Sequence, residues 1–221
     1  KSHDKSCTEL IINSGIKKIS CPKIDNNPKV KGSGFKELEK AGIEIISSWG
    51  KDQISQIDEL YSSYDFKIIN KRPRVSAKFA MSLDGKISTS NKESKWITSE
   101  DSRNKVHEIR NKSDAIITGI NTVISDNSKL TARKNSKHTG KPQYRVVLDN
   151  NAKLNNSFEI YKDQNSGKVI WFTSKNSNPT NIPNHITHIN SKNETISPLE
   201  VITFLSEMGC YEILIESGGT V

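Results

Sequence analysis

The first part of the chain alternates between helical and β-like spacing of its apolar residues. The pattern predicts the order helix, strand, helix, strand, helix over residues 7–15, 17–23, 35–42, 43–48 and 51–64. Gly15 and Gly42 stand where the first two helices end, because glycine readily adopts the left-handed conformation that closes a helix. Two short strands bury too little apolar surface for a stable core, so we expect this stretch to be part of a larger domain.

A different pattern begins after residues 66–75, where basic residues surround Pro73, a composition typical of a junction between a helix and a strand. Beyond it, short apolar runs alternate with helices. Strands are predicted over residues 75–83, 85–90, 114–120, 144–150, 168–174 and 211–221, the last running into Gly218-Gly219. This alternation predicts an α/β fold with a mostly parallel sheet.

Helix-start signals stand out twice in this second part. Thr98 with Asp101 resembles a capping box and predicts a helix over 98–112. Residues 197–200 (SPLE) combine a serine cap, a proline at the first helical position and a glutamate at the third, and predict a helix that ends at Gly209.

Two further segments connect these elements. Asp84-Gly85 lies between two β-like runs, which predicts a hairpin added antiparallel to the sheet. Residues 175–195 are polar and rich in turn formers, and we expect a surface loop there.

Composition excludes several classes of protein. The 221 residues carry a net charge of +8, but it is spread along the chain without a block of like charges, so we expect no nucleic-acid partner. Three scattered cysteines make no disulfide framework, and no apolar run could span a membrane, so we expect a cytoplasmic protein. The sequence lacks an initial methionine, and we expect it to be part of a longer chain.

Common nucleotide and hydrolase motifs are missing, including the glycine-rich fingerprints of dinucleotide-binding and P-loop folds. The chain instead places Glu216, Gly218 and Gly219 directly after an apolar strand. Ligands of α/β sheets bind at the carboxyl ends of strands, and glycines let main-chain N–H groups approach a phosphate. The alternative is an ordinary turn after the strand.

A second candidate follows the strand that ends at Gly119. Thr122, Asp126 and Arg133 lie in what we expect to be a polar loop, and such side chains bind hydroxyl and phosphate groups. The alternative is a solvated loop with a capping aspartate. Arg110 ends the preceding helix, where a cation stabilises the helix dipole whatever else it does.

Several blocks, in order, carry a specific resemblance. They are KFAMSLDGKIST, ESKWIT, SRNKVHEIRNKSDAIITGINTVISD, LTAR, RVVLD and ILIESGGT. With them, residues 71–221 resemble the reductase domain of the bifunctional riboflavin-biosynthesis deaminase/reductase family, without its last elements. The resemblance implies a dihydrofolate-reductase-like fold and NADPH-dependent reduction of the ribosyl group of 5-amino-6-(5-phosphoribosylamino)uracil to a ribitylamino product.

Residues 1–70 resemble the C-terminal part of that family's zinc deaminase domain, a cytidine-deaminase-like α/β domain. Cys7 falls where the last zinc-binding cysteine lies, but the other ligands and the proton-shuttling glutamate are absent from the sequence. Because one thiolate cannot make a zinc site, we expect zinc only in a complete deaminase domain and no deamination by this chain.

The resemblance also implies two groups of site residues. The substrate contacts are Ser94, Arg110, Leu130, Arg133 and Glu216. The cofactor contacts are Ala80, Trp96, Thr122, Asp126, Asn150, Gly218 and Gly219. Lys78, Asp126, Glu216 and a bound water stay open as proton donors. A homodimer is implied as well.

Two other functions remain alternatives at this stage. One is a fragment that binds a nucleotide without catalysis. The other is a dihydrofolate-reductase-like enzyme that acts on another pterin or pyrimidine.

Overall fold

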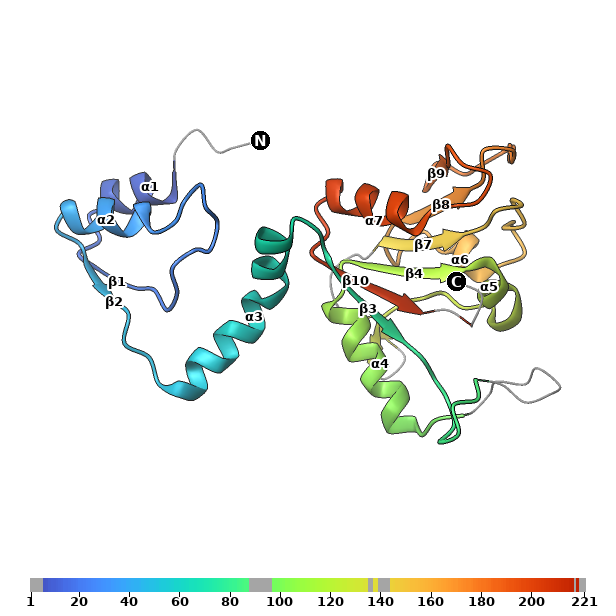
Figure 1. Ribbon diagram of the computed structural model, residues 1–221, viewed down its shortest axis with the longest axis horizontal. Coiled ribbons are helices and arrows are strands. Elements are labelled where there is room, and N and C mark those ends of the chain that lie inside the picture. The colour runs from blue at the N-terminus through green and yellow to red at the C-terminus, as the bar shows by residue number, and fades with distance from the viewer. Residues whose placement is uncertain (1–5, 88–96, 135–136, 139–143, 217, 219–221) are drawn as a thin grey trace. The chain divides into compact units, whose positions relative to one another are not determined.

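The computed structural model describes residues 6–87, 97–134, 137–138, 144–216 and 218. The chain divides into two compact units, Lys1–Lys71 and Arg72–Val221, and each is described by itself (Figure 1). No helix in the described part of the chain is long and apolar enough to cross a membrane.

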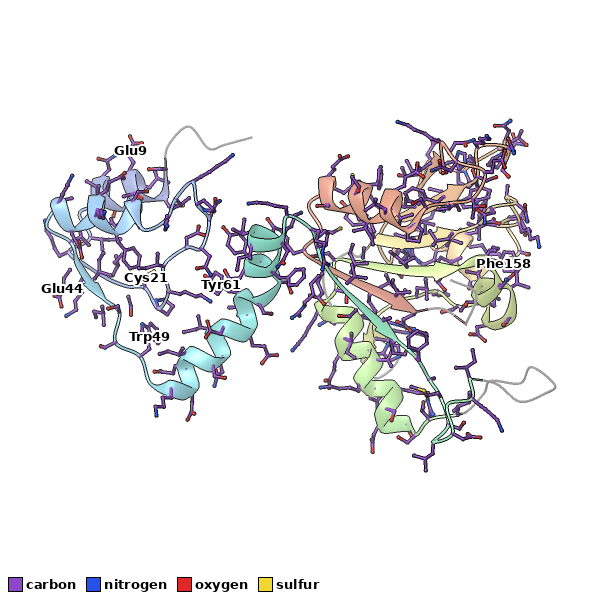
Figure 2. The ribbon with its side chains drawn as sticks, viewed as in Figure 1. Glu9, Cys21, Glu44, Trp49, Tyr61 and Phe158 are labelled. Carbon is purple, nitrogen blue, oxygen red and sulfur yellow. The ribbon has the colours of Figure 1, made fainter. Side chains whose placement is uncertain are left out.

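The first unit follows the predicted order of elements. They are α1 (Cys7–Asn13), β1 (Lys18–Ser20), α2 (Ser33–Lys40), β2 (Glu44–Ile46) and α3 (Lys51–Asn70). β1 and β2 pair in parallel, and Gly15 and Gly42 adopt positive φ angles of 76° and 77° after α1 and α2. The third helix is longer than predicted and extends to Asn70, so the first half of the expected junction at 66–75 is helical. Tyr61 lies on this helix (Figure 2).

A six-stranded sheet organises the second unit. Its strands are β3 (Arg74–Lys78), β4 (Ala115–Gly119), β7 (Tyr144–Leu148), β8 (Val169–Thr173), β9 (Ile186–Asn190) and β10 (Glu212–Glu216). The spatial order is β3-β10-β4-β7-β8-β9, and every neighbouring pair is parallel, which confirms the predicted α/β class. Because the strands are parallel, their carboxyl ends, which are followed by the polar residues named from the sequence, all lie at one edge of the sheet.

Helices and a small ribbon complete the second unit. They are α4 (Glu100–Lys112), α5 (Ile120–Asp126), α6 (Glu159–Lys162), α7 (Pro198–Glu207) and a two-stranded antiparallel ribbon, β5 (Arg133–Lys134) with β6 (Lys137–His138). Figure 1 shows α7 and α4 on opposite sides of the sheet.

Both faces of the sheet are buried, because successive side chains of a strand point to opposite sides. On one face, Ile117 and Phe172 pack with Leu205 of α7. On the other face, Ile116 packs with Val123 of α5, and the cluster there also includes Ile160 of α6; Phe158, labelled in Figure 2, lies against this cluster. This double coverage explains why the central strands β4 and β8, which are buried along their whole length, read as nearly continuous apolar runs.

The predicted hairpin is wrong in its first half. β3 ends at Lys78, and residues 79–87 form no strand. Gly85, with φ of 79°, closes a turn by donating its main-chain N–H to the carbonyl of Ser82 at 2.9 Å. Phe79, Met81 and Leu83 are exposed, so no buried face holds this run in the sheet. The second run, 85–90, is described only as far as residue 87.

Two segments that we expected to be loops contain regular structure. Residues 175–195 include β9, which pairs with β8, and the stretch after Gly119 forms α5. Among the described strands β9 is the last in the sheet order and has one neighbour, β8; edge strands of this kind tolerate polar side chains. Its His188 ring hydrogen-bonds Thr173 at 2.8 Å.

The helix caps also differ in detail from the sequence signals. α4 starts two residues later than predicted, and the cap is Ser99 instead of Thr98, with the Ser99 hydroxyl accepting the N–H of Ser102 at 3.3 Å. α7 starts at Pro198 as predicted, but the Ser197 hydroxyl makes no capping bond. Glu200 instead accepts the hydroxyl of Ser191 at 2.6 Å.

Candidate functional site

A buried carboxylate lies at the carboxyl edge of the sheet. Glu216 is the last residue of β10 and pairs in register with Lys78, the last residue of β3. Arg110 of α4 grips it with two bonds, from Nε to Oε1 at 2.5 Å and from Nη2 to Oε2 at 3.0 Å. Lys78 Nζ lies 3.2 Å from Oε2. The structure thus joins three of the residues named from sequence.

Burial and charge act in opposite directions on Glu216, whose side chain is 6% exposed. Burial raises the pKa of its carboxyl, but the hydrogen bonds and charge of Arg110, followed by those of Lys78, outweigh it and leave the pKa below its ordinary value. Glu216 is therefore a charged acceptor at neutral pH. This protonation state argues against Glu216 as the proton donor and favours hydrogen bonding to hydroxyl groups.

Helix α4 also holds the chain segment that carries Arg133. Arg110 Nη1 donates to the carbonyl of Thr131 at 3.0 Å, and one turn earlier His107 Nδ1 accepts the main-chain N–H of Arg133 at 3.3 Å. The Arg133 side chain itself is exposed. Sequence reasoning missed His107, although its spacing of three residues from Arg110 placed it on the same face of the helix.

A hydroxyl and a glycine meet beyond the neighbouring strands β4 and β10. Thr122, in the first turn of α5, accepts the main-chain N–H of Gly218 at 3.3 Å. A side chain built on Gly218 would meet no atom within 4 Å, so its Cα faces open space. Asp126 lies four residues after Thr122 in α5 and thus on the same side of that helix.

The remaining expected site residues fall into different surroundings. Ala80 lies two residues beyond the end of β3. Leu130 is 2% exposed and packs in the core cluster of α5, so the structure gives it a packing role and not an open contact for a ligand. Asn150 uses Oδ1 to accept the N–H of Ile196 at 2.9 Å. Ser94, Trp96 and Gly219 lie outside the described residues.

Cys7 is exposed at the start of α1. Among the residues that the structure describes, no three histidine, cysteine or acidic side chains are grouped closely enough to hold a metal ion.

A second buried carboxylate, which sequence reasoning did not assign a role, follows β7. Asp149 is fully buried, and its Oδ2 accepts the indole N–H of Trp171 at 3.1 Å and the main-chain N–H of Leu154 at 2.8 Å. These bonds close the turn after β7. Asp149 thus stabilises the turn at the carboxyl end of β7.

The fold and these side chains define the class of the protein. It is an open α/β-sheet protein with a group of polar side chains at the carboxyl ends of β3, β10 and β4. This group contains the Glu216 carboxylate with its two cations and the contact between Thr122 and Gly218. Open α/β sheets bind their ligands at this edge. The model of the RibD C-terminal domain matches residues 73–221, and the chain belongs to this family. The resemblance to the reductase domain and its dihydrofolate-reductase-like fold is confirmed.

Relatives extend this similarity over nearly the whole chain. The riboflavin biosynthesis protein RibD of Synechocystis is 34% identical over 217 residues, which cover 96% of this chain and 56% of that protein. The RibD protein of Aquifex aeolicus is 34% identical over 170 residues, covering 77% and 46%. The chain therefore spans about half the length of these curated relatives.

Solved structures agree with this similarity. A Thermotoga maritima diaminohydroxyphosphoribosylaminopyrimidine deaminase/5-amino-6-(5-phosphoribosylamino)uracil reductase is 33% identical, with a TM-score of 0.75 over 97% of this chain and 57% of that one. RibD of Acinetobacter baumannii is 29% identical, with a TM-score of 0.78 over 97% and 58%.

Proposed function

We propose that the chain carries an NADPH-dependent 5-amino-6-(5-phosphoribosylamino)uracil reductase of riboflavin biosynthesis. The observation that carries the proposal is the Glu216 carboxylate held by Arg110 and Lys78 at the carboxyl edge of the sheet, beside the Thr122–Gly218 pair. A charged acceptor of this kind suits the hydroxyl groups of a sugar. The Thermotoga relative is a reductase of this substrate by its printed name.

The residues of the second group fit a nicotinamide nucleotide. Gly218 leaves open space beside a main-chain N–H, and Thr122 supplies a hydroxyl next to it. These two residues would hold the cofactor with Asp126, Ala80 and the main chain around Asn150. When bound, NADPH supplies the hydride that the sugar carbon accepts.

The substrate would bind with its phosphate toward Arg133 and its ribose toward Glu216. The exposed guanidinium of Arg133 can bind a phosphate with two parallel hydrogen bonds. Arg110 and Lys78 keep Glu216 charged and oriented, so that it accepts from ribose hydroxyls. Binding energy from the remote phosphate would then fix the reacting carbon in place.

Opening the glycosylamine ring requires a proton, and we propose Lys78 as its donor. Its ammonium group is 29% exposed and lies 3.2 Å from Oε2 of Glu216, so it can reach a ligand without leaving the carboxylate. Glu216 is less suited because it is already deprotonated. Asp126 and a bound water are the alternative donors. A Lys78→Met variant that keeps both full cofactor binding and full turnover would favour one of these alternatives over Lys78.

The direct test follows NADPH oxidation with 5-amino-6-(5-phosphoribosylamino)uracil and, separately, with dihydrofolate. We expect turnover only with the first. Turnover with dihydrofolate alone would instead identify a reductase of pterins. NADPH binding without turnover of either compound would identify a nucleotide-binding chain that does not catalyse.

Arg133→Ala distinguishes the two ligand sites. We expect the KM for the phosphorylated substrate to rise at least about tenfold, because a charged hydrogen bond is lost, while the KM for NADPH changes less than about twofold. Steady-state kinetics measure both constants. Equal increases in the two constants would contradict the assignment of Arg133 to the substrate phosphate.

Further proposals rest on the resemblance. Residues 1–70 would be the C-terminal part of a zinc deaminase-like domain, and residues 71–221 would be the reductase domain. The active form would be a cytoplasmic homodimer that has no nucleic-acid or membrane partner. Light scattering of the purified protein tests the dimer, and a mass equal to one chain would contradict it.

A further inference from the structure

Two side chains of α4 hold the segment 131–133, one as a hydrogen-bond donor and the other as an acceptor. Arg110 donates to the carbonyl of Thr131 at 3.0 Å, and His107 accepts the N–H of Arg133 at 3.3 Å. Both side chains come from one face of α4, three residues apart. The main chain of Arg133 is thus tied to the helix that also holds Glu216.

This arrangement fixes the base from which the exposed Arg133 side chain extends. β5 has only two residues and pairs with the equally short β6, so its own ladder holds it weakly. The buried residues Thr131 and Ala132 fix the chain before Arg133, and the bond to His107 is the side-chain contact that holds the main chain of Arg133 itself. A long, exposed arginine depends on a fixed main chain if its guanidinium is to meet a ligand in one geometry.

We propose that His107 is a positioning residue that orients Arg133 toward the phosphate of a sugar-phosphate ligand. This inference rests on the proposed function, since it assumes that the ligand of Arg133 is that phosphate. His107 itself does not touch the ligand in this arrangement. Its role is to accept one main-chain N–H with an unprotonated Nδ1.

The surroundings of the imidazole support the unprotonated form. Burial lowers the pKa of His107, and the charges of Arg110 on its own helix and of Arg133 on β5 lower it further. The Thr131 carbonyl and the Glu216 carboxylate on β10 act in the opposite direction but less strongly. The lowered pKa favours the neutral imidazole, and the bond from the Arg133 N–H makes Nδ1 the acceptor and leaves the proton on Nε2.

The test compares two substitutions at His107 in the whole chain. Asparagine can place its Oδ1 near the position of Nδ1 and keep the acceptor, whereas leucine fills similar space without one. We expect His107→Leu to raise the KM for the phosphorylated substrate roughly fivefold to tenfold, the loss of about one hydrogen bond, with kcat and the KM for NADPH within about twofold. His107→Asn should recover most of this loss.

His185→Leu provides a matched control. Its ring hydrogen-bonds the main-chain carbonyl of Tyr161 at 2.7 Å, so the same chemical change is made away from α4. We expect the KM for the phosphorylated substrate to stay unchanged in this variant. A KM effect of His107→Leu that asparagine does not rescue, or one shared by His185→Leu, would overturn the inference.

Two measurements do not depend on turnover. Ribose 5-phosphate binding, followed by calorimetry, should weaken in His107→Leu and recover in His107→Asn. Hydrogen exchange of the Arg133 amide should accelerate in the leucine variant alone. If the wild-type chain and the two variants bind ribose 5-phosphate as expected but the wild-type chain does not oxidise NADPH, the proposed reaction is contradicted and the role of His107 stands. A wild-type chain that binds no ribose 5-phosphate would overturn the inference itself.

Discussion

At the scale of single residues, Glu216 shows how neighbours decide what a side chain does. Removed from water alone, a carboxylate would take up a proton, because burial disfavours the charged form. Arg110 and Lys78 reverse this outcome by surrounding both oxygens with donors. The sequence named all three residues, but only the pairing of β3 with β10 and the position of α4 brought them within bonding distance.

Glu216→Gln should destabilise the protein by about 3 kcal/mol, because it removes the negative charge that the two neighbouring cations require and leaves one oxygen acceptor in place of two. Denaturant unfolding measures the change. Glu212→Gln is the matched control on the same strand, since Glu212 pairs with an Arg74 side chain that is 43% exposed, and we expect a loss below about 1 kcal/mol. Equal losses in the two variants would contradict the special role of the Glu216 cluster.

The stability contributed by Glu216 should also depend on pH. Its folded-state pKa lies below the ordinary value of 4.5, so the unfolded chain binds the proton more readily. The contribution is complete above about pH 4.5 and is lost as the pH falls through the folded-state pKa. The difference in unfolding free energy between wild type and Glu216→Gln should therefore shrink in acid; a difference that stays constant would contradict this.

At the scale of elements, the edge of the sheet is built by strands that are distant in sequence. β4 and β10 lie side by side although nearly a hundred residues separate them, and their following segments meet at Thr122 and Gly218. α5 presents Thr122 there, although the sequence favoured a polar loop. A helix of seven residues carries too weak a periodicity to be recognised without its packing against β4.

Thr122→Val should raise the KM for NADPH about fivefold and leave the KM for the substrate within about twofold, because it removes one hydroxyl with little change in volume. Steady-state kinetics with each ligand varied in turn measure the two constants. Thr187→Val, at an exposed position of β9, is the control and should change neither. A larger effect on the substrate constant would place Thr122 outside the cofactor site.

At the scale of the whole molecule, the two units differ greatly in buried apolar surface. Among the described residues of the first unit, Leu38 and Ile43 are the fully buried apolar side chains, whereas the second unit buries both faces of a six-stranded sheet. Burial of apolar surface is the main stabilising contribution to folding. Stability is therefore unevenly distributed along this chain.

Hydrogen exchange should report this difference directly. We expect the amides of β4, β7 and β8 to exchange at least about a hundredfold more slowly than those of β1 and β2, because the former open only with the core. Exchange of the intact chain at neutral pH, analysed by peptide, provides the comparison. Similar protection in the two units would mean that the first unit is stabilised by contacts that its buried residues do not reveal.

The sequence by itself determined the class of fold, and it predicted Lys78, Arg110 and Glu216, which the structure brings into contact. Apolar runs within 114–120 and 168–174 predicted the buried strands β4 and β8, and ordered blocks around Arg110, Arg133 and Glu216 identified the family. Local patterns carry this information because side-chain period and turn chemistry are local properties.

Tertiary structure alone decided the rest. The end of β3 at Lys78, the presence of β9 and the contact of His107 with Arg133 depend on which residues find a buried face or a main-chain partner. Exposed apolar residues after Lys78 could not continue a strand, while polar residues of β9 could pair with β8. Hydrogen bonds between segments far apart in sequence form only when the fold brings them together, so no local pattern could have predicted them.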